Sequence, residues 1–333
     1  MLEALIQFAL SASAIVFAGV FLVKSSDSIG ELTKLGRLFA GSIFLAGATS
    51  LPELLVDVSA IRKGMPDLAV GDLLGSSLMN LLILAVADLL HRNPNKMFSR
   101  AGAQHALSAA ISINMTVLAC IAIFLGPQLG EFGLGEIGLG PIAIGVAYIF
   151  GLRLVYYNQH PSAQAIGPAS GPNRRRELAR ALSIYAGSAL VIFVAAPFLA
   201  EAAGEIAEIS GLGKTFIGTT LVAFCTSLPE IVSTVVAVRM GAFDLAVGNI
   251  FGSNAFNMIL MIPLDLIHEG NLLGVVSRTH VLTGLSVILA TSVAVMGQLY
   301  QAEKRKKFIE PDAFTVIGIV IGTLLILYWL GVA

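Results

Sequence analysis

An identical five-residue segment, Thr-Ser-Leu-Pro-Glu, occurs twice in the chain, at residues 49–53 and 226–230. Each copy lies within a long apolar stretch, where an ionisable side chain is costly and is therefore a candidate for function. Proline cannot donate a backbone hydrogen bond, so we expect the proline of each copy to interrupt a helix and to free carbonyl oxygens. Together with the carboxylates of Glu53 and Glu230, these hydroxyl and carbonyl oxygens would suit a hard cation such as Ca²⁺ or Na⁺.

The freed carbonyls are expected in the turn before each proline, at Ala46, Thr49, Ala223 and Thr226. The structural alternative is a proline kink whose glutamate bonds to a neighbouring helix. That alternative does not explain why the whole segment is duplicated. The chain has only 2 cysteines and 5 histidines, without a ligand cluster, so a site for a softer metal such as zinc is not expected.

A second motif follows each segment: Gly71, Gly75, Ser76 and Asn80 recur as Gly248, Gly252, Ser253 and Asn257. Glycines four residues apart allow another helix to approach closely, so we interpret them as packing residues. Serine and asparagine four residues apart share one helix face and can direct their oxygens together. We predict that Ser76, Asn80, Ser253 and Asn257 bind an ion, the alternative being hydrogen bonds between helices.

Both motifs belong to one internal repeat. Residues 41–90 align with residues 218–267 without a gap, at an offset of 177, and 21 of the 50 positions are identical. Asp57 and Asp72 break this symmetry, because the second copy has Thr234 and Asn249 in their places. The two aspartates could line the route of the ion or simply bond to a neighbouring group, and the sequence leaves both readings open.

The composition is that of a membrane protein. Hydrophobic residues make up 56% of the chain, charged residues only 12%, and the mean hydropathy is +0.86. Soluble proteins carry about 25% charged residues, so a soluble enzyme is excluded, and so is a disordered chain. Strand-type alternation is absent, which argues against an outer-membrane barrel.

Ten apolar segments reach the length of about 20 residues that a membrane-spanning helix needs. They lie near residues 2–23, 38–61, 67–90, 103–125, 137–157, 181–203, 212–238, 243–267, 279–299 and 313–332. With the N-terminus outside, 16 of the 20 lysines and arginines, Lys24 among them, fall in loops on the cytoplasmic side. The charge distribution therefore predicts that both termini are non-cytoplasmic.

The two copies of the repeat lie five predicted spans apart, so the second copy enters the membrane in the opposite direction. The predicted fold is an all-α membrane protein with ten transmembrane helices in two inverted five-helix repeats. Transporters of this type bind substrate near the membrane midplane. We expect residues 1–160 to form the first repeat, residues 161–180 a basic cytoplasmic linker, and residues 181–333 the second repeat.

The paired motifs resemble the two alpha repeats of the cation/Ca²⁺ exchanger superfamily, specifically its Na⁺/Ca²⁺ exchanger branch of the prokaryotic type. The resemblance is strong over residues 41–90 and 218–267 and rests elsewhere on span count and topology. It is specific, because the proton-coupled branch carries Gly-Asn-x-x-Glu where this chain has Thr-Ser-Leu-Pro-Glu. The resemblance implies a secondary antiporter that exchanges Na⁺ for Ca²⁺ by alternating access.

The resemblance also implies four central ion sites, with the first and sixth spans acting as sliding gate helices. On the matching positions, Glu53 and Glu230 would bind Ca²⁺ together with the carbonyls of Thr49 and Thr226. Asn80 and Asn257 would line the middle site. The flanking Na⁺ sites would share the two threonines and would draw on Ala46, Ser50, Ser76, Ala223, Ser227 and Ser253.

The chain departs from the family at Asn80 and Asn257, because several members carry aspartate at one of these positions. A Ca²⁺/H⁺ or K⁺-coupled antiporter of the same fold therefore remains an alternative. An intramembrane enzyme is less favoured, since no nucleophile and base accompany the acidic residues. An ion channel is also less favoured, because a tight charged cage would hold an ion too firmly for rapid conduction.

The expected partners are Ca²⁺ and Na⁺, with H⁺ as a third candidate, and the lipid bilayer. No cofactor, nucleic acid or obligatory protein partner is expected. We expect an integral protein of a prokaryotic inner (plasma) membrane.

Overall fold

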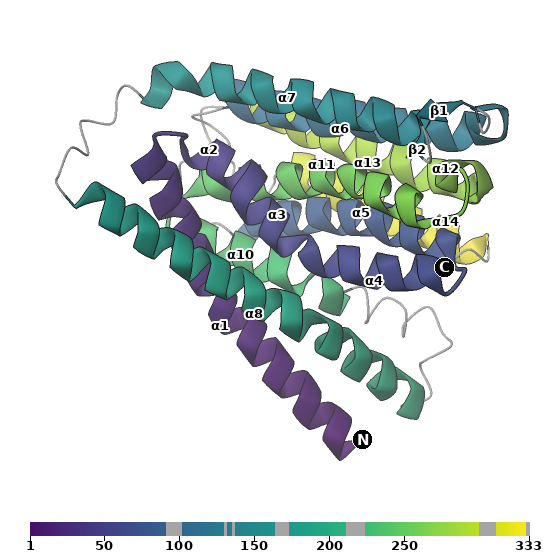
Figure 1. The fold of residues 1–333 in the computed structure, drawn as a ribbon, viewed down its shortest axis with the longest axis horizontal. Helices are drawn as coiled ribbons and strands as arrows, with labels where there is room; N and C mark the ends of the chain where they lie inside the picture. Colours follow the sequence, from purple (N-terminus) through teal and green to yellow (C-terminus); the bar gives the residue numbers. More distant parts are fainter. Residues whose placement is uncertain are drawn as a thin grey trace. The chain divides into compact units, whose positions relative to one another are not determined.

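The computed structural model describes residues 1–90, 102–129, 132–134, 137–163, 173–210, 224–299 and 311–330 (Figure 1). These residues are almost entirely helical, apart from a two-stranded antiparallel ribbon of β1 (Gly133–Leu134) and β2 (Ile137–Gly138). Eight of the described helices are long and apolar enough to cross a membrane. They are α1 (Leu2–Thr33), α5 (Pro66–Leu90), α6 (Gly102–Leu129), α7 (Leu139–Ala163), α8 (Arg174–Ile209), α11 (Phe243–Ile267), α13 (Thr279–Leu299) and α14 (Pro311–Trp329).

A ninth candidate span is interrupted at Ser50. Its first part consists of α2 (Arg37–Phe39), the π-helix η1 (Ala40–Leu45) and α3 (Ala46–Thr49), and its second part is α4 (Leu51–Arg62). The seventh predicted span, 212–238, is represented by α10 (Leu228–Arg239), while residues 211–223 lie outside the described part of the chain. The expectation of a helical membrane protein is confirmed, and the count of ten spans stays a prediction.

The first helix is longer than hydropathy predicts. It was expected to end near residue 23, but α1 continues to Thr33 through a polar stretch. The hydroxyl groups of Ser25 and Ser28 donate to the carbonyls of Leu22 and Lys24, at 3.0 and 2.9 Å, so they are satisfied within the helix. The placement of Lys24 in a loop was therefore wrong, because this residue lies inside α1.

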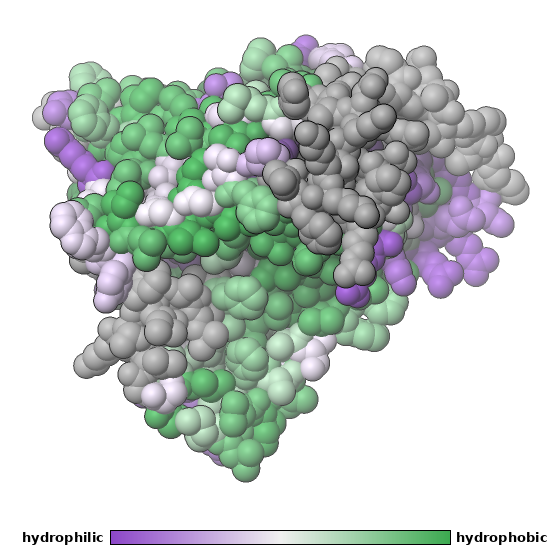
Figure 2. Space-filling model, turned by 180° about the vertical axis from the view of Figure 1, so that it is seen from behind, coloured by the Kyte–Doolittle hydropathy of each residue, from purple (hydrophilic) through white to green (hydrophobic). Residues whose placement is uncertain are grey.

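The outer surface is rich in exposed apolar side chains, as Figure 2 shows for one face. Leu2, Phe17, Ile149 and Trp329 are all more than 65% exposed. Large contiguous apolar surfaces are rare on proteins that face water. This surface suits contact with lipid, in keeping with the apolar composition.

Contacts divide the chain into two compact units. Unit 1 contains Met1–Pro52 and Val155–Ile250, and unit 2 contains Glu53–Leu154 and Phe251–Val332. Each unit therefore draws on both of the predicted sequence repeats. The two units are described separately below.

In unit 1, α1 and α8 lie side by side along much of their length (Figure 1). The guanidinium group of Arg174, in the first turn of α8, donates to the carbonyl of Leu32 at 2.9 Å and so caps the last turn of α1. The buried core beside these helices includes Leu22, Leu45 and Ile192. The first predicted span is thus held against the sixth by both apolar packing and a capping arginine.

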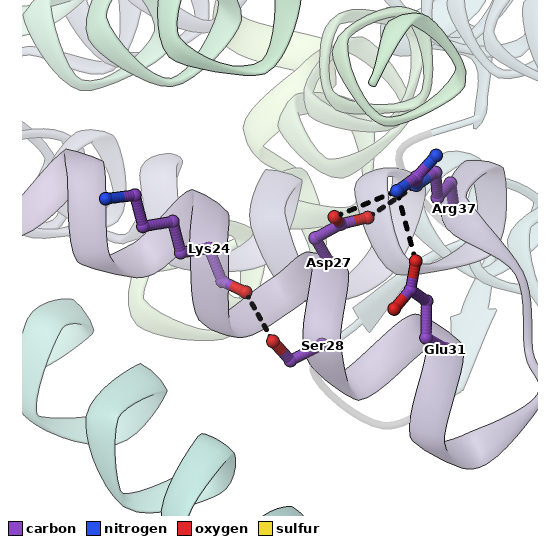
Figure 3. Close-up of polar contacts among 5 residues, drawn as sticks. All are labelled: Lys24, Asp27, Ser28, Glu31 and Arg37. Atoms are coloured by element: carbon purple, nitrogen blue, oxygen red, sulfur yellow. Dashed lines mark hydrogen bonds and ion pairs between the residues drawn. The ribbon is translucent and has the colours of Figure 1, made fainter. Parts of the chain in front are cut away.

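An ion-pair cluster ties the end of α1 to the start of α2 (Figure 3). Arg37 Nε donates to Asp27 Oδ1 at 2.6 Å, and Arg37 Nη2 donates to Asp27 Oδ2 and to Glu31 Oε1, each at 3.1 Å. The bidentate geometry orients the arginine, which is still 41% exposed. Because exposed ion pairs contribute little free energy, this cluster mainly fixes how the chain turns between the two helices.

In unit 2, α13 packs against α5, α6 and α14. The shared core includes Leu73, Met115 and Ile123. Asp265 of α11 is fully buried and accepts hydrogen bonds from the backbone N–H groups of Gly138 and Leu272, at 2.7 and 2.8 Å. This carboxylate connects the β-ribbon and the short helix α12 (Leu272–Val275) to α11.

The sequence repeat is reproduced as two helical hairpins with identical boundaries. Helices α4 and α10 have 12 residues each, α5 and α11 have 25 each, and all four boundaries are displaced by the same 177 positions. Gly64 and Gly241 both have φ of 71°, which ends the first helix of each hairpin in a left-handed turn. The following N–H groups, of Met65 and Ala242, bond to the carbonyls of Ala60 and Ala237, each at 2.9 Å.

Candidate ion-binding site

Each Thr-Ser-Leu-Pro-Glu segment contains a helix break at its serine. Ser50 (φ −90°, ψ 3°) and Ser227 (φ −80°, ψ 6°) leave helical geometry, and a new helix begins at the following leucine. The proline therefore occupies the first turn of that new helix, where its missing N–H group has no helical partner to lose. The expectation of an interrupted span is confirmed, but the interruption lies at the serine rather than at the proline.

The carbonyl of Ala46 is engaged within the helix. It accepts a hydrogen bond from the Ser50 N–H at 3.0 Å and another from the Thr49 hydroxyl at 3.2 Å. The expectation that this carbonyl is left bare was therefore wrong for the structure described here. Its counterpart Ala223 lies outside the described residues. A ligand role for either carbonyl stays a prediction.

The side chains of both segments that lie in unit 1 are buried. Thr49 and Ser50 are fully enclosed, Ser227 and Glu230 are each 1% exposed, and Thr226 is 5% exposed. The Ser50 hydroxyl has no hydrogen-bond partner among the described residues. Burial of a carboxylate and several hydroxyls away from water is the environment expected for a cation site in a membrane.

In unit 2, the predicted ligands Glu53, Ser76, Asn80, Ser253 and Asn257 are all buried, with exposures from 0% to 7%. Asn80 Nδ2 donates to Asn254 Oδ1 at 3.0 Å, which links α5 to α11. Asn257 Nδ2 points back to α5, at 3.3 Å from the carbonyl of Leu73. The two predicted asparagines thus lie where α5 and α11 meet.

The amide oxygens of Asn80 and Asn257 have no hydrogen-bond partner among the described residues. A buried polar atom without a partner is costly, so such atoms call for a ligand or a bound ion. Amide and hydroxyl oxygens are among the ligands that Ca²⁺ and Na⁺ prefer. The prediction that these asparagines face an ion is therefore chemically consistent with their surroundings.

Two further residues, Ser77 and Asn254, position these asparagines and were not predicted. Asn254 Nδ2 donates to the carbonyl of Ser77 at 3.1 Å, and the Ser77 hydroxyl accepts from Asn257 Nδ2 at 3.3 Å. Both are fully buried. The available signal was their matched position in the repeat, 177 residues apart.

The hairpins bring the same positions together in both copies. In α10–α11, Asn249 Nδ2 donates to the hydroxyls of Ser233 and Thr234, at 3.0 and 3.4 Å. In α4–α5, the matching residues Asp57 and Asp72 interact through their carboxyl groups. One helical turn further from the bend, this register places Glu53 of α4 beside the position of Ser76 on α5.

The predicted residues thus fall into two groups. Glu53 lies in unit 2 with Ser76, Asn80, Ser253 and Asn257, whereas Glu230 lies in unit 1 with Thr49, Ser50, Thr226 and Ser227. The shared Ca²⁺ site of Glu53 and Glu230 therefore stays a prediction. Within the described residues, no cluster of three or more His, Cys, Asp or Glu side chains could hold a metal. Any ion bound by these helices must therefore rely on hydroxyl, amide and carbonyl oxygens beside isolated carboxylates.

Comparison with known proteins identifies the family. The profile described as "Sodium/calcium exchanger protein" matches residues 3–153 and 181–332, which is most of the chain. The chain belongs to the sodium/calcium exchanger family. As a member of that family, it is an integral membrane protein and a cation antiporter.

Curated relatives of this exchanger cover similar lengths. The sodium/calcium exchanger MaX1 of Methanosarcina acetivorans is 29% identical over 272 residues, covering 74% of this chain and 77% of its own. The inner membrane protein YrbG of Escherichia coli is 28% identical over 259 residues, covering 76% and 74%. The resemblance inferred from the two motifs is thereby confirmed.

The fold of this exchanger is shared with a solved structure. The sodium-calcium exchanger NCX_Mj, soaked with 10 mM Na⁺ and zero Ca²⁺, superposes with a TM-score of 0.71 over 98% of this chain and 97% of its own. Sequence identity is only 18%, so this likeness concerns the fold. It agrees with the helical architecture described above.

Proposed function

We propose that this exchanger moves Ca²⁺ against Na⁺, and that Glu53 and Glu230 supply the carboxylate ligands for Ca²⁺. The observation that carries the proposal is the duplicated Thr-Ser-Leu-Pro-Glu segment, in which both glutamates are 1% exposed and each follows a helix break. A buried carboxylate needs a compensating positive charge. A transported cation supplies that charge when it binds.

The remaining ligands follow from the repeat. Carbonyls of Thr49 and Thr226 complete the Ca²⁺ site, and Asn80 and Asn257 line its middle. Na⁺ binds to the hydroxyl groups and carbonyls that flank it, so that Na⁺ and Ca²⁺ compete for shared ligands. The Na⁺ ligands are Ala46, Ser50, Ser76, Ala223, Ser227 and Ser253.

We further propose ten transmembrane helices in two inverted repeats, with α1 and α8 as the gate helices. The side-by-side packing of α1 and α8 supports the pairing of the first and sixth spans. The charge asymmetry of the loops supports a non-cytoplasmic location for both termini. The name of the Escherichia coli relative, an inner membrane protein, supports location in a prokaryotic inner membrane.

Coupling to H⁺ or K⁺ is the second candidate, favoured by the presence of Asn80 and Asn257 where family members carry a charge. Uptake of radiolabelled Ca²⁺ into proteoliposomes, with one imposed gradient at a time, separates the candidates. Na⁺-driven uptake at constant pH and constant K⁺ is the expected result. Uptake that follows only a pH or K⁺ gradient would overturn the assignment of Na⁺ as the coupling ion.

A further inference from the structure

Unit 2 contains a pair of facing acidic side chains that the proposed ion site does not use. Asp57 of α4 and Asp72 of α5 interact through their carboxyl groups. Asp57 is fully buried, and neither of its carboxyl oxygens has a hydrogen-bond partner of standard geometry among the described residues. The buried Oδ2 of Asp72 also lacks one.

Two ionised carboxylates cannot satisfy each other, because both are acceptors only. Their like charges repel, and burial removes the water that would otherwise solvate them. A single proton resolves both problems. It turns one carboxyl group into a donor whose O–H bonds to the other group, and it leaves one negative charge instead of two.

The second hairpin shows what neutral side chains do at the same positions. There Thr234 and Asn249 replace the two aspartates, and Asn249 Nδ2 donates to the Thr234 hydroxyl at 3.4 Å and to Ser233 Oγ at 3.0 Å. The register of the hairpin therefore brings these two positions into contact regardless of their chemistry. The amide hydrogen present in the second copy has no equivalent in the first.

No basic side chain among the described residues acts on the acidic pair, whose carboxyl groups feel chiefly each other. On α4, the nearest ionisable group is Glu53, one turn away. Toward the bend, Asp67 of α5 is engaged with His280 of α13, with Asp67 Oδ1 at 3.0 Å from His280 Nε2. The carboxylate of Asp312, on α14, lies against Gly297 near the opposite end of α5.

We propose that Asp57 and Asp72 form a proton-binding site in which two buried carboxyl groups share one proton. The proton is bound by one carboxyl oxygen and hydrogen-bonded to the other group. When it leaves, two facing carboxylates remain between α4 and α5, in the hairpin that also carries Glu53 and Ser76. The site therefore makes the first hairpin, and not the second, sensitive to pH, and it does so whichever ion drives Ca²⁺ transport.

Infrared spectroscopy of the purified full-length protein in lipid, without Ca²⁺, tests the site directly. A protonated carboxyl group has a C=O stretch distinct from the bands of a carboxylate. We expect a protonated-carboxyl band that disappears as pH rises and that is lost in Asp57→Asn and in Asp72→Asn. A wild-type spectrum without this band throughout the pH range of the folded protein would overturn the proposal.

The matched control is the double variant Asp57→Thr/Asp72→Asn, which copies the second hairpin. We expect it to fold, because the same side chains are accommodated there, and to lose the band while its Ca²⁺ transport becomes less dependent on pH. An unchanged band in this variant would assign the proton to another group and refute the site. Loss of the band together with an unchanged pH profile would refute the proposed pH sensitivity of the hairpin. The spectroscopic result does not depend on which ions are exchanged, so it is independent of the proposed function.

Discussion

Buried carboxylates without basic partners carry the ion chemistry of this chain at the scale of single residues. Glu53 and Glu230 are each 1% exposed, within helices that follow a break in the backbone. A neutral amide has nearly the same shape but cannot match the charge of a bound cation. The effect of replacing either glutamate therefore reports on charge rather than on packing.

We predict that Glu53→Gln and Glu230→Gln each abolish Ca²⁺ exchange while the protein still folds. Removing one partner of a buried charge pair costs about 3–5 kcal/mol, so Ca²⁺ affinity should fall by roughly 100-fold or more. Exchange in proteoliposomes and elution in gel filtration measure the two properties. Glu31→Gln, the same change at an exposed side chain, is the control and should exchange normally. Wild-type exchange by either buried variant would show that its glutamate is not a ligand.

Asn80 offers a second test at this scale. Its Nδ2 donates to Asn254 Oδ1, so Asn80→Asp replaces a donor with a second acceptor at a buried contact. Without an ion, we expect the variant to be destabilised by about 1–3 kcal/mol. Added Ca²⁺ should raise its thermal unfolding midpoint more than that of the wild type, because the new carboxylate needs a counter-charge. Equal responses to Ca²⁺ would mean that this position does not face the ion.

At the scale of helices, the hairpins α4–α5 and α10–α11 are the elements that present the site. Their boundaries, their positive-φ glycines and their capping hydrogen bonds all coincide at an offset of 177 residues. The glycines inside the second helices do not behave alike, however. In unit 1, a Cβ on Gly248 of α11 would lie 2.6 Å from the carbonyl oxygen of Leu38, whereas a Cβ on Gly75 of α5 would meet no described atom within 4 Å.

This difference predicts that Gly248→Ala is destabilising and that Gly75→Ala is tolerated. The backbone that faces Gly248 cannot move as a flexible side chain could, and overpacking of this kind costs about 1–3 kcal/mol. Thermal unfolding of the two purified variants in detergent provides the comparison. A Gly248→Ala variant as stable as Gly75→Ala would show that η1 and α11 do not approach as closely as described.

Sequence patterns predicted these elements well where a repeat or a long apolar run defined them. The exact position of the helix break was not predictable, because a proline can either kink a helix or begin one, and the choice depends on the backbone before it. The extension of α1 past residue 23 was missed because Ser25 and Ser28 satisfy their hydroxyls within the helix, which hydropathy does not register. The roles of Ser77 and Asn254 depend on how α5 and α11 are rotated, and only the structure supplies that.

At the scale of the whole molecule, the distribution of basic residues predicts that both termini lie on the non-cytoplasmic side. Cysteines introduced at Glu3 and Val332 should be labelled by an impermeant reagent from that side only. The native Cys120 and Cys225 are both buried, so background labelling should be low. Labelling of the two positions from opposite sides would rule out an even number of spans.

The central claim is that the duplicated segments supply one set of oxygen ligands for which Na⁺ and Ca²⁺ compete. Calorimetric titration of the purified protein with Ca²⁺, at several fixed Na⁺ concentrations and constant pH, tests this claim most directly. The account predicts that the apparent Ca²⁺ affinity falls steadily as Na⁺ is raised, while the number of Ca²⁺ ions bound at saturation is unchanged. A Ca²⁺ affinity that does not depend on Na⁺ would contradict it.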